Sequence, residues 1–334
     1  MRTIYIPLIG IILIGVLVGT ESIGRSQSEP ASQPKPQADK ADNEFRIISH
    51  SDLVLLDVSV KDPKGGFVSG LTKDQFKIFD NGKEQPIQVF EAGDIPVTVG
   101  LVVDNSGSMR NKKPDVVTAA LTFITESNPA DEMFVVNFND NVQLAMPPGT
   151  PFTSDRDILR ASLLTNRVEG RTALNDALRV GLSHLEKGKQ AKKTLVLISD
   201  GGDNASITET NEFFELAGKS RATIYAVGIY SPDDRDRNPG FLKKTAAMTG
   251  GECFLPDQLT ELVDVCRRIA KDIRNRYAIG FIPSENELNG GVRKLKVVAT
   301  APDRGKLIVR TRTHYLAAST PAHQHAGKNE EHHK

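Results

Sequence analysis

The chain contains no tryptophan and only two cysteines among its 334 residues. Two cysteines are too few for the disulfide framework of a small secreted domain. Aromatic residues make up 6% of the chain and are mostly phenylalanines inside apolar runs, so no stacking surface for nucleic-acid bases is evident. The 42 lysines and arginines equal the 42 aspartates and glutamates, and this balance gives no electrostatic reason to expect a nucleic-acid partner.

Enzyme signatures are equally scarce. Residues 181–185 (Gly-Leu-Ser-His-Leu) come nearest to the Gly-x-Ser-x-Gly turn of hydrolases, but they lack the last glycine and fall in a predicted helix. The sequence has no glycine loop for phosphate and no His-Glu-x-x-His pair. His184 and His314 fall in a predicted helix and a predicted strand, where packing or surface roles are expected. The sequence therefore indicates a protein that is not an enzyme.

The N-terminal segment has the character of an export signal. An apolar run from Ile4 to Gly19 follows Arg2, and its length lies between a signal-peptide core and a membrane span. Residues 1–24 are therefore predicted to be a signal peptide or a membrane anchor, with a buried N-terminal element as the alternative. We expect an extracytoplasmic protein that is secreted, periplasmic or anchored, and that meets a membrane only through this segment if it is not removed.

Two polar segments are predicted to be disordered. Residues 25–43 consist mainly of Ser, Gln, Pro, Lys and Ala, a composition typical of a flexible linker. Residues 317–334 form a polar tail, for which loose metal binding by its histidines is the alternative. These segments are expected to lie outside the folded part of the protein.

The central part of the chain alternates buried strands with amphipathic helices. Residues 97–103 are apolar or β-branched almost throughout, the pattern of a strand buried on both faces. Further strands are predicted at 133–138, 142–146, 194–199, 223–229 and 251–255, and helices at 114–126, 155–164, 173–186, 209–219, 240–248 and 259–273. This alternation predicts an α/β fold over residues 93–276, with a doubly wound, mostly parallel sheet and helices on both faces.

Segments of two-residue period flank this central part. The first contains an alternating strand around residues 54–60 and a predicted hairpin in which Asn81 and Gly82 join residues 76–79 to residues 87–90. After the central part, three more strands are expected, near residues 277–282, 295–299 and 307–309. Each segment alone is too short for a robust core. Residues 44–92 and 277–316 are therefore predicted to form one flanking β-sandwich.

Small polar residues follow the central strand directly. Asp104, Ser106 and Ser108 occupy alternate positions on the loop that leaves residues 97–103. A carboxylate and two hydroxyls are oxygen donors that suit Mg²⁺, which proteins usually hold with few carboxylates. In open parallel sheets, ligands bind outside the carboxyl ends of the strands, where this loop is expected. The stretch is therefore a candidate cation site.

The Asp-x-Ser-x-Ser pattern of residues 104–108 resembles the metal-ion-dependent adhesion site (MIDAS) of von Willebrand factor type A domains. The resemblance implies a threonine in a loop before a later helix and an aspartate at the end of a later buried strand. Thr172 and Asp200 stand in those contexts. A second likeness, to bacterial secreted proteins of the von Willebrand A-related type, rests on Val68, Gly70, Leu71 and Phe76, and the two together cover most of the chain after the linker.

The resemblance implies a ligand set and a function. The implied metal ligands, which bind directly or through water, are Asp104, Ser106, Ser108, Thr172 and Asp200. Mg²⁺ is the implied ion, with Mn²⁺ or Ca²⁺ as alternatives. Neutral hydroxyls with few carboxylates leave the cation electrophilic, so a carboxylate from a protein partner would complete its shell. That these residues merely cap helices and turns is the structural alternative.

We therefore expect a metal-dependent protein-binding module that serves adhesion or scaffolding. One alternative is an envelope assembly component in which the metal only stabilises the fold, and another is a metal-assisted hydrolase. Three further residues leave choices open. Asp203 is either an extra ligand or a surface carboxylate, and Cys253 and Cys266 are either bridged or free.

Overall fold

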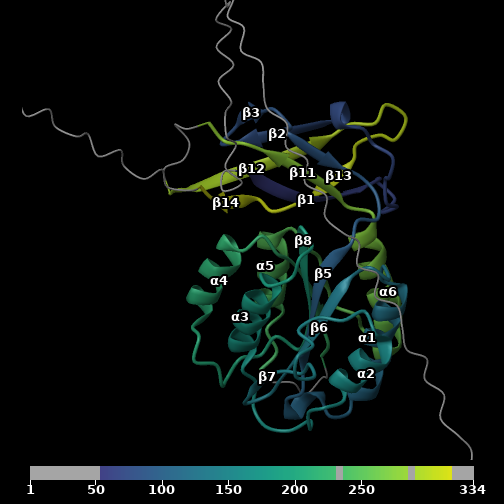
Figure 1. Ribbon diagram of the computed structural model, residues 1–334, viewed down its shortest axis with the longest axis vertical. Helices are drawn as coiled ribbons and strands as arrows, with labels where there is room; N and C mark the ends of the chain where they lie inside the picture. The colour runs from purple at the N-terminus through teal and green to yellow at the C-terminus, as the bar shows by residue number, and fades with distance from the viewer. Residues whose placement is uncertain (1–52, 231–235, 285–289, 318–334) are drawn as a thin grey trace, which may run out of the picture. The chain divides into compact units, whose positions relative to one another are not determined.

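Three β-sheets organise the part of the chain that the computed structural model describes, which is residues 53–230, 236–284 and 290–317 (Figure 1). The predicted export segment, the linker and all but the first residue of the predicted tail lie outside these ranges. Within the same ranges, no helix is both long enough and apolar enough to cross a membrane.

The largest sheet is mostly parallel and has the strand order β10-β9-β8-β5-β6-β7. Its strands are β5 (Val97–Asp104), β6 (Glu132–Phe138), β7 (Val142–Leu144), β8 (Lys192–Ser199), β9 (Thr223–Gly228) and β10 (Cys253–Phe254). All eight residues of β5 are buried, as expected for a strand that pairs in parallel with β6 and β8 and is covered on both faces. Only β7 runs antiparallel to its neighbour.

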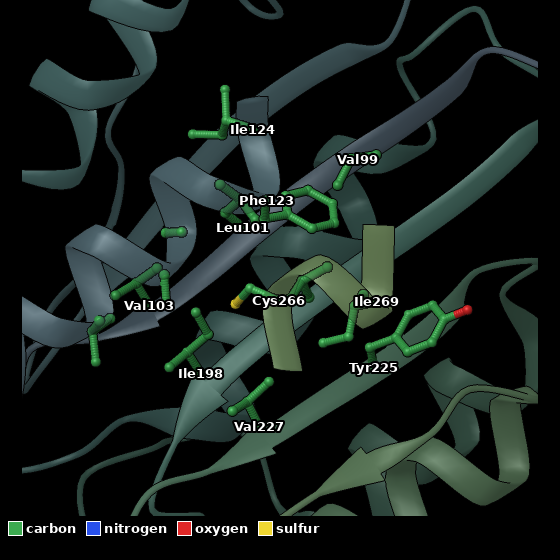
Figure 2. Close-up of a cluster of buried hydrophobic side chains, with 14 of the residues drawn as sticks. Val99, Leu101, Val103, Phe123, Ile124, Ile198, Tyr225, Val227, Cys266 and Ile269 are labelled. Carbon is green, nitrogen blue, oxygen red and sulfur yellow. The ribbon is translucent and has the colours of Figure 1, made fainter. Parts of the chain in front are cut away.

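Amphipathic helices cover both faces of this sheet (Figure 1). Helices α1 (Lys113–Glu126), α2 (Arg156–Leu163) and α6 (Leu262–Arg274) bury their apolar residues against one face. Figure 2 shows Phe123 of α1 and Ile269 of α6 beside strand residues of this core. The other face packs against α3 (Leu174–Leu185), α4 (Thr210–Lys219) and α5 (Pro239–Thr249). The predicted doubly wound α/β fold is confirmed.

Two four-stranded sheets form the flanking β-sandwich, with the orders β13-β1-β11-β4 and β14-β12-β2-β3. Their strands are β1 (Val54–Lys61), β2 (Phe76–Asp80), β3 (Lys83–Gln85), β4 (Val89–Glu91), β11 (Tyr277–Phe281), β12 (Val292–Ala299), β13 (Ile308–Arg310) and β14 (His314–Leu316). Each sheet contains strands from both ends of the chain, and their apolar residues share one core. This arrangement confirms the sandwich as part of the predicted fold class.

The predicted hairpin around Asn81 and Gly82 is wrong in its second strand. Both turn residues have positive φ, as the tight hairpin turn requires, but β2 pairs with β3 rather than with residues 87–90. Pro86 follows β3 directly and has no backbone N–H to donate, so the ladder ends there. Strand β4 instead pairs with β11 in the opposite sheet.

Buried charged groups connect the sandwich strands to the α/β part. Arg276, which is 1% exposed, donates from Nη1 to Asp57 Oδ2 on β1 over 2.9 Å. Asp272 of α6 accepts hydrogen bonds from Ser59 Oγ and from Tyr225 Oη on β9. Although burial alone would raise the pKa of Asp272, Arg276 and the hydrogen bond from Ser59 hold that pKa below its usual value. The network therefore keeps an ionised carboxylate inside the protein.

His184 on α3 is a packing residue. Its ring lies between Phe134 and Phe152, with centroid distances of 4.5 and 4.7 Å. The ring Nε2–H donates to the carbonyl oxygen of Pro151 over 2.8 Å. Burial lowers the pKa of His184, because the protonated ring would lose hydration among apolar neighbours.

This burial predicts a pH-dependent contribution to stability. Because the folded protein binds a proton at His184 less readily than the unfolded chain does, the contribution is full above the unfolded pKa of about 6.5 and is lost as pH falls through it. We expect His184→Gln to lose less stability than the wild type between about pH 7.5 and about pH 5.5, measured as urea midpoints. His314→Gln, at an exposed position, should follow the wild type. Equal losses in His184→Gln and the wild type would contradict the prediction.

Candidate metal centre

The loop after β5 folds around the carboxylate that ends the strand. Asp104 is completely buried, and its Oδ1 accepts a hydrogen bond of 2.8 Å from the backbone N–H of Ser106. Its Oδ2 accepts one of 2.6 Å from the hydroxyl of Ser199 at the end of β8. The two strands are parallel neighbours, so their carboxyl ends meet at one edge of the sheet. Both oxygens of Asp104 are thereby fixed.

Ser108 connects this loop to the residue that follows β8. Its hydroxyl donates to Asp200 Oδ2 over 2.7 Å, and it shares a hydrogen bond of 3.1 Å with the hydroxyl of Ser106. Asp200 Oδ1 accepts a further hydrogen bond from the backbone N–H of Gly202. The structure therefore brings together four of the five predicted residues through direct contacts, and the contact between Ser108 and Asp200 joins residues 92 positions apart in sequence.

A third loop places Thr172 against the other two. The backbone N–H of Gly107 donates to the carbonyl of Gly170 over 3.0 Å. Gly170 has φ of +79°, a backbone conformation that other residues rarely adopt, and a Cβ there would lie 1.8 Å from Asp140 Oδ2. Two residues further on, Thr172 is buried, with an exposed fraction of 6%.

Asn204 holds the backbone of Thr172 from the loop that follows Asp200. The N–H of Thr172 donates to Asn204 Oδ1 over 2.9 Å, and its carbonyl accepts from the N–H groups of Asn204 and Ala205 at 3.0 Å each. The hydroxyl of Thr172 makes no hydrogen bond with any described residue. Thr172 thus lies in a loop fixed to both others, with its hydroxyl left for a further contact.

Two like charges meet at this centre. Burial, together with the nearby carboxylate of Asp200, raises the pKa of Asp104 to about 6. Lys113 carries the neighbouring positive charge, but its Nζ donates to Asn105 Oδ1, and burial lowers its pKa to about 8. A pair of adjacent carboxylates with several hydroxyl oxygens suits a hard divalent cation.

The residues present therefore fit the implied ion. In the described ranges, no group of three or more His, Cys, Asp or Glu side chains is placed to hold a metal. A cation at this edge would instead depend on hydroxyl oxygens, as the Asp-x-Ser-x-Ser pattern implies. The unbonded hydroxyl of Thr172 is the structural feature that matches this requirement most closely.

The remaining candidates are Asp203, which binds backbone N–H groups, and the two cysteines, which are free. Asp203 accepts hydrogen bonds from the backbone N–H groups of Asn175 and Ser206, and so fixes the start of α3 and its own loop. Cys253 is half-buried and Cys266 is buried, and both are free thiols.

Sequence reasoning missed two residues that orient the candidate ligands. Ser199, whose hydroxyl donates to Asp104, is a polar residue at the end of an apolar run. Its position could therefore have been noticed in the sequence. Asn204 stands in an Asn-x-Ser pattern typical of glycosylation acceptors, and this pattern gives no indication that Asn204 forms hydrogen bonds with Thr172.

The sequence profile of the von Willebrand factor type A domain matches residues 99–202, which include all five candidate ligands. Over these residues the chain is therefore similar to von Willebrand factor type A domains.

Its relatives are distant. The uncharacterized protein sll0103 of Synechocystis sp. is 22% identical over 187 residues, which are 54% of this chain and 42% of that protein. The inter-alpha-trypsin inhibitor heavy chain H4 of Bos taurus is 24% identical over 204 residues, which are 56% of this chain and 22% of that protein. The chain thus spans less than half the length of each of these two curated relatives.

Solved structures of low identity also align with the chain. A von Willebrand factor type A protein from Catenulispora acidiphila has a TM-score of 0.49 and 15% identity, over 75% of this chain and 76% of that chain. BatB from Bacteroides thetaiotaomicron has a TM-score of 0.41 and 17% identity, over 52% and 98% of the two chains. Mussel byssus proximal thread matrix protein 1, with a zinc-occupied MIDAS motif, has a TM-score of 0.45 and 18% identity, over 54% and 48%.

Proposed function

We propose that the protein is an extracytoplasmic binding module for adhesion or scaffolding, and that it grips an acidic residue of a protein partner through a divalent cation, with Mg²⁺ as the expected ion. The observation that carries the proposal is the meeting of two buried carboxylates with the hydroxyls of Ser106 and Ser108 at the carboxyl edge of the sheet. The export character of residues 1–24 supports the extracytoplasmic assignment.

Each residue has a separate task in this proposal. The ligands would be Asp104, Ser106, Ser108, Thr172 and Asp200, acting directly or through water. A bound cation supplies the electrostatic attraction that holds a partner carboxylate. Ser199 fixes the carboxylate of Asp104, and Asn204 fixes the backbone of Thr172, so the donors are oriented before the ion arrives.

Asn204→Ala is expected to weaken Mg²⁺ binding about tenfold or more, because residues that orient metal ligands usually contribute this much. The variant keeps every proposed ligand but loses the hydrogen bond to the N–H of Thr172. Isothermal titration with Mg²⁺ measures the effect. The matched control is Asn128→Ala, which removes an asparagine that caps the N–H of Ala130 in another loop. If Asn204→Ala binds Mg²⁺ as tightly as Asn128→Ala does, Asn204 has no role in positioning Thr172.

The function itself is tested by capture from the native envelope on the immobilised full chain. We expect a specific partner to be retained in Mg²⁺, released by EDTA, and not retained by Thr172→Ala. A purely structural metal predicts the opposite for the variant, since Thr172→Ala would then still retain the partner. Retention that is insensitive to both EDTA and Thr172→Ala would contradict the proposal.

A further inference from the structure

Ile207 is an apolar side chain that the protein leaves in solvent. It is 93% exposed, the highest value among the large apolar residues of the described ranges. Its neighbour Thr208 is buried, so the chain turns inward directly after the isoleucine. Single exposed apolar residues are common on protein surfaces. Ile207 differs because of how its loop is held and where that loop lies.

The loop that carries Ile207 is fixed by hydrogen bonds to the start of α3. Asp176 Oδ2 accepts from the backbone N–H of Ile207 over 2.8 Å, and its Oδ1 accepts from that of Thr208 over 2.9 Å. In return, the N–H of Asp176 donates to the hydroxyl of Ser206 over 3.1 Å. The side-chain amide of Asn175 donates to the carbonyl of Thr208 over 3.2 Å. The backbone that carries Ile207 is thus fixed by these hydrogen bonds.

The same loop holds the candidate ligand Thr172. The N–H groups of Asn204 and Ala205 both donate to the carbonyl of Thr172. Ile207 follows Ala205 by two residues, so their Cα atoms are at most about 8 Å apart. An apolar side chain of high exposure therefore lies in the loop that binds the backbone of a proposed metal ligand.

We propose that Ile207 is a specificity contact: the protein partner carries an apolar side chain close to its metal-binding carboxylate, and that side chain packs against Ile207. This inference rests on the proposed function. Binding would remove apolar surface from water on both sides. The cost in conformational entropy would be small, because the loop is already ordered and isoleucine has few rotamers.

The test is a selection of short random peptides displayed on phage against the immobilised full chain in Mg²⁺, with elution by EDTA. For the wild type we expect enrichment of peptides in which an Asp or Glu has an apolar neighbour. Ile207→Ser should enrich acidic peptides without the apolar preference. It should also bind a peptide selected on the wild type about tenfold more weakly, with unchanged affinity for Mg²⁺. Val292→Ser, an exposed apolar residue on β12 of the sandwich, should behave as the wild type does.

The outcomes separate this inference from the function on which it rests. If the wild type enriches acidic peptides without an apolar preference, or Ile207→Ser keeps that preference, the role of Ile207 is overturned and the metal-dependent function stands. If EDTA elutes no enriched acidic peptides from the wild type, the proposed function fails and the role of Ile207 fails with it.

Discussion

Asp200→Asn is expected to abolish the stabilisation of the protein by Mg²⁺. For the wild type, Mg²⁺ at one hundred times its dissociation constant should add about 2.7 kcal/mol to the free energy of unfolding, a rise in Tm of about 5–10 °C. Asparagine keeps the shape of Asp200 but removes the charge that attracts the cation. Without Mg²⁺ the variant should be at least as stable as the wild type, because it no longer places a second negative charge beside the buried Asp104. Thermal unfolding with and without Mg²⁺ measures both effects.

The matched control is Asp203→Asn, three residues further along the chain. Asp203 is exposed and caps backbone N–H groups, so this variant should keep the full response to Mg²⁺. The opposite result, in which Asp203→Asn loses the response to Mg²⁺ and Asp200→Asn keeps it, would show that the metal binds outside the proposed ligand set.

Arg276→Met is expected to destabilise the protein by about 3–5 kcal/mol, measured as the free energy of unfolding in urea. The arginine is fully buried, and its removal leaves the carboxylate of Asp272 inside the protein without its cation. Asp57, whose Oδ2 accepts from Arg276 Nη1, loses its partner in the same step. The large effect therefore comes from unpaired buried charge rather than from lost side-chain volume, since methionine fills much of the space.

Arg274→Met provides the comparison two residues earlier. Arg274 pairs with Asp94 at the surface, where its side chain is 42% exposed, and such pairs contribute about 0–1 kcal/mol. A loss in Arg276→Met no larger than that in Arg274→Met would mean that the buried network does not stabilise the contact between the sandwich and the α/β part.

The fold class could be predicted because strand burial leaves a direct trace in sequence. Strand β5 was expected at residues 97–103 and is observed at Val97–Asp104, and α3 was expected at 173–186 and is observed at Leu174–Leu185. Strand pairing in the sandwich was less accessible. Asn81 and Gly82 specify a turn, but no local pattern shows that β4 pairs with β11, which lies far away in sequence.

The candidate site shows the same division. The residue types and their element contexts suggested Asp104, Ser106, Ser108, Thr172 and Asp200. Their joint role as metal ligands stays a prediction, as do the domain boundaries proposed from the sequence. The contacts of Ser199 and Asn204 could not be derived from residue spacing, because they depend on how three loops approach one another in space.

The central claim is that oxygen donors from three loops converge on one divalent cation. Anomalous diffraction from crystals soaked in Mn²⁺ tests it most directly. We expect a single strong peak at the carboxyl edge of the large sheet, in contact with the hydroxyl oxygens of Ser106, Ser108 and Thr172. Saturating Mn²⁺ that gives no peak there, or a peak that Thr172 and Asp200 do not approach, would contradict the claim.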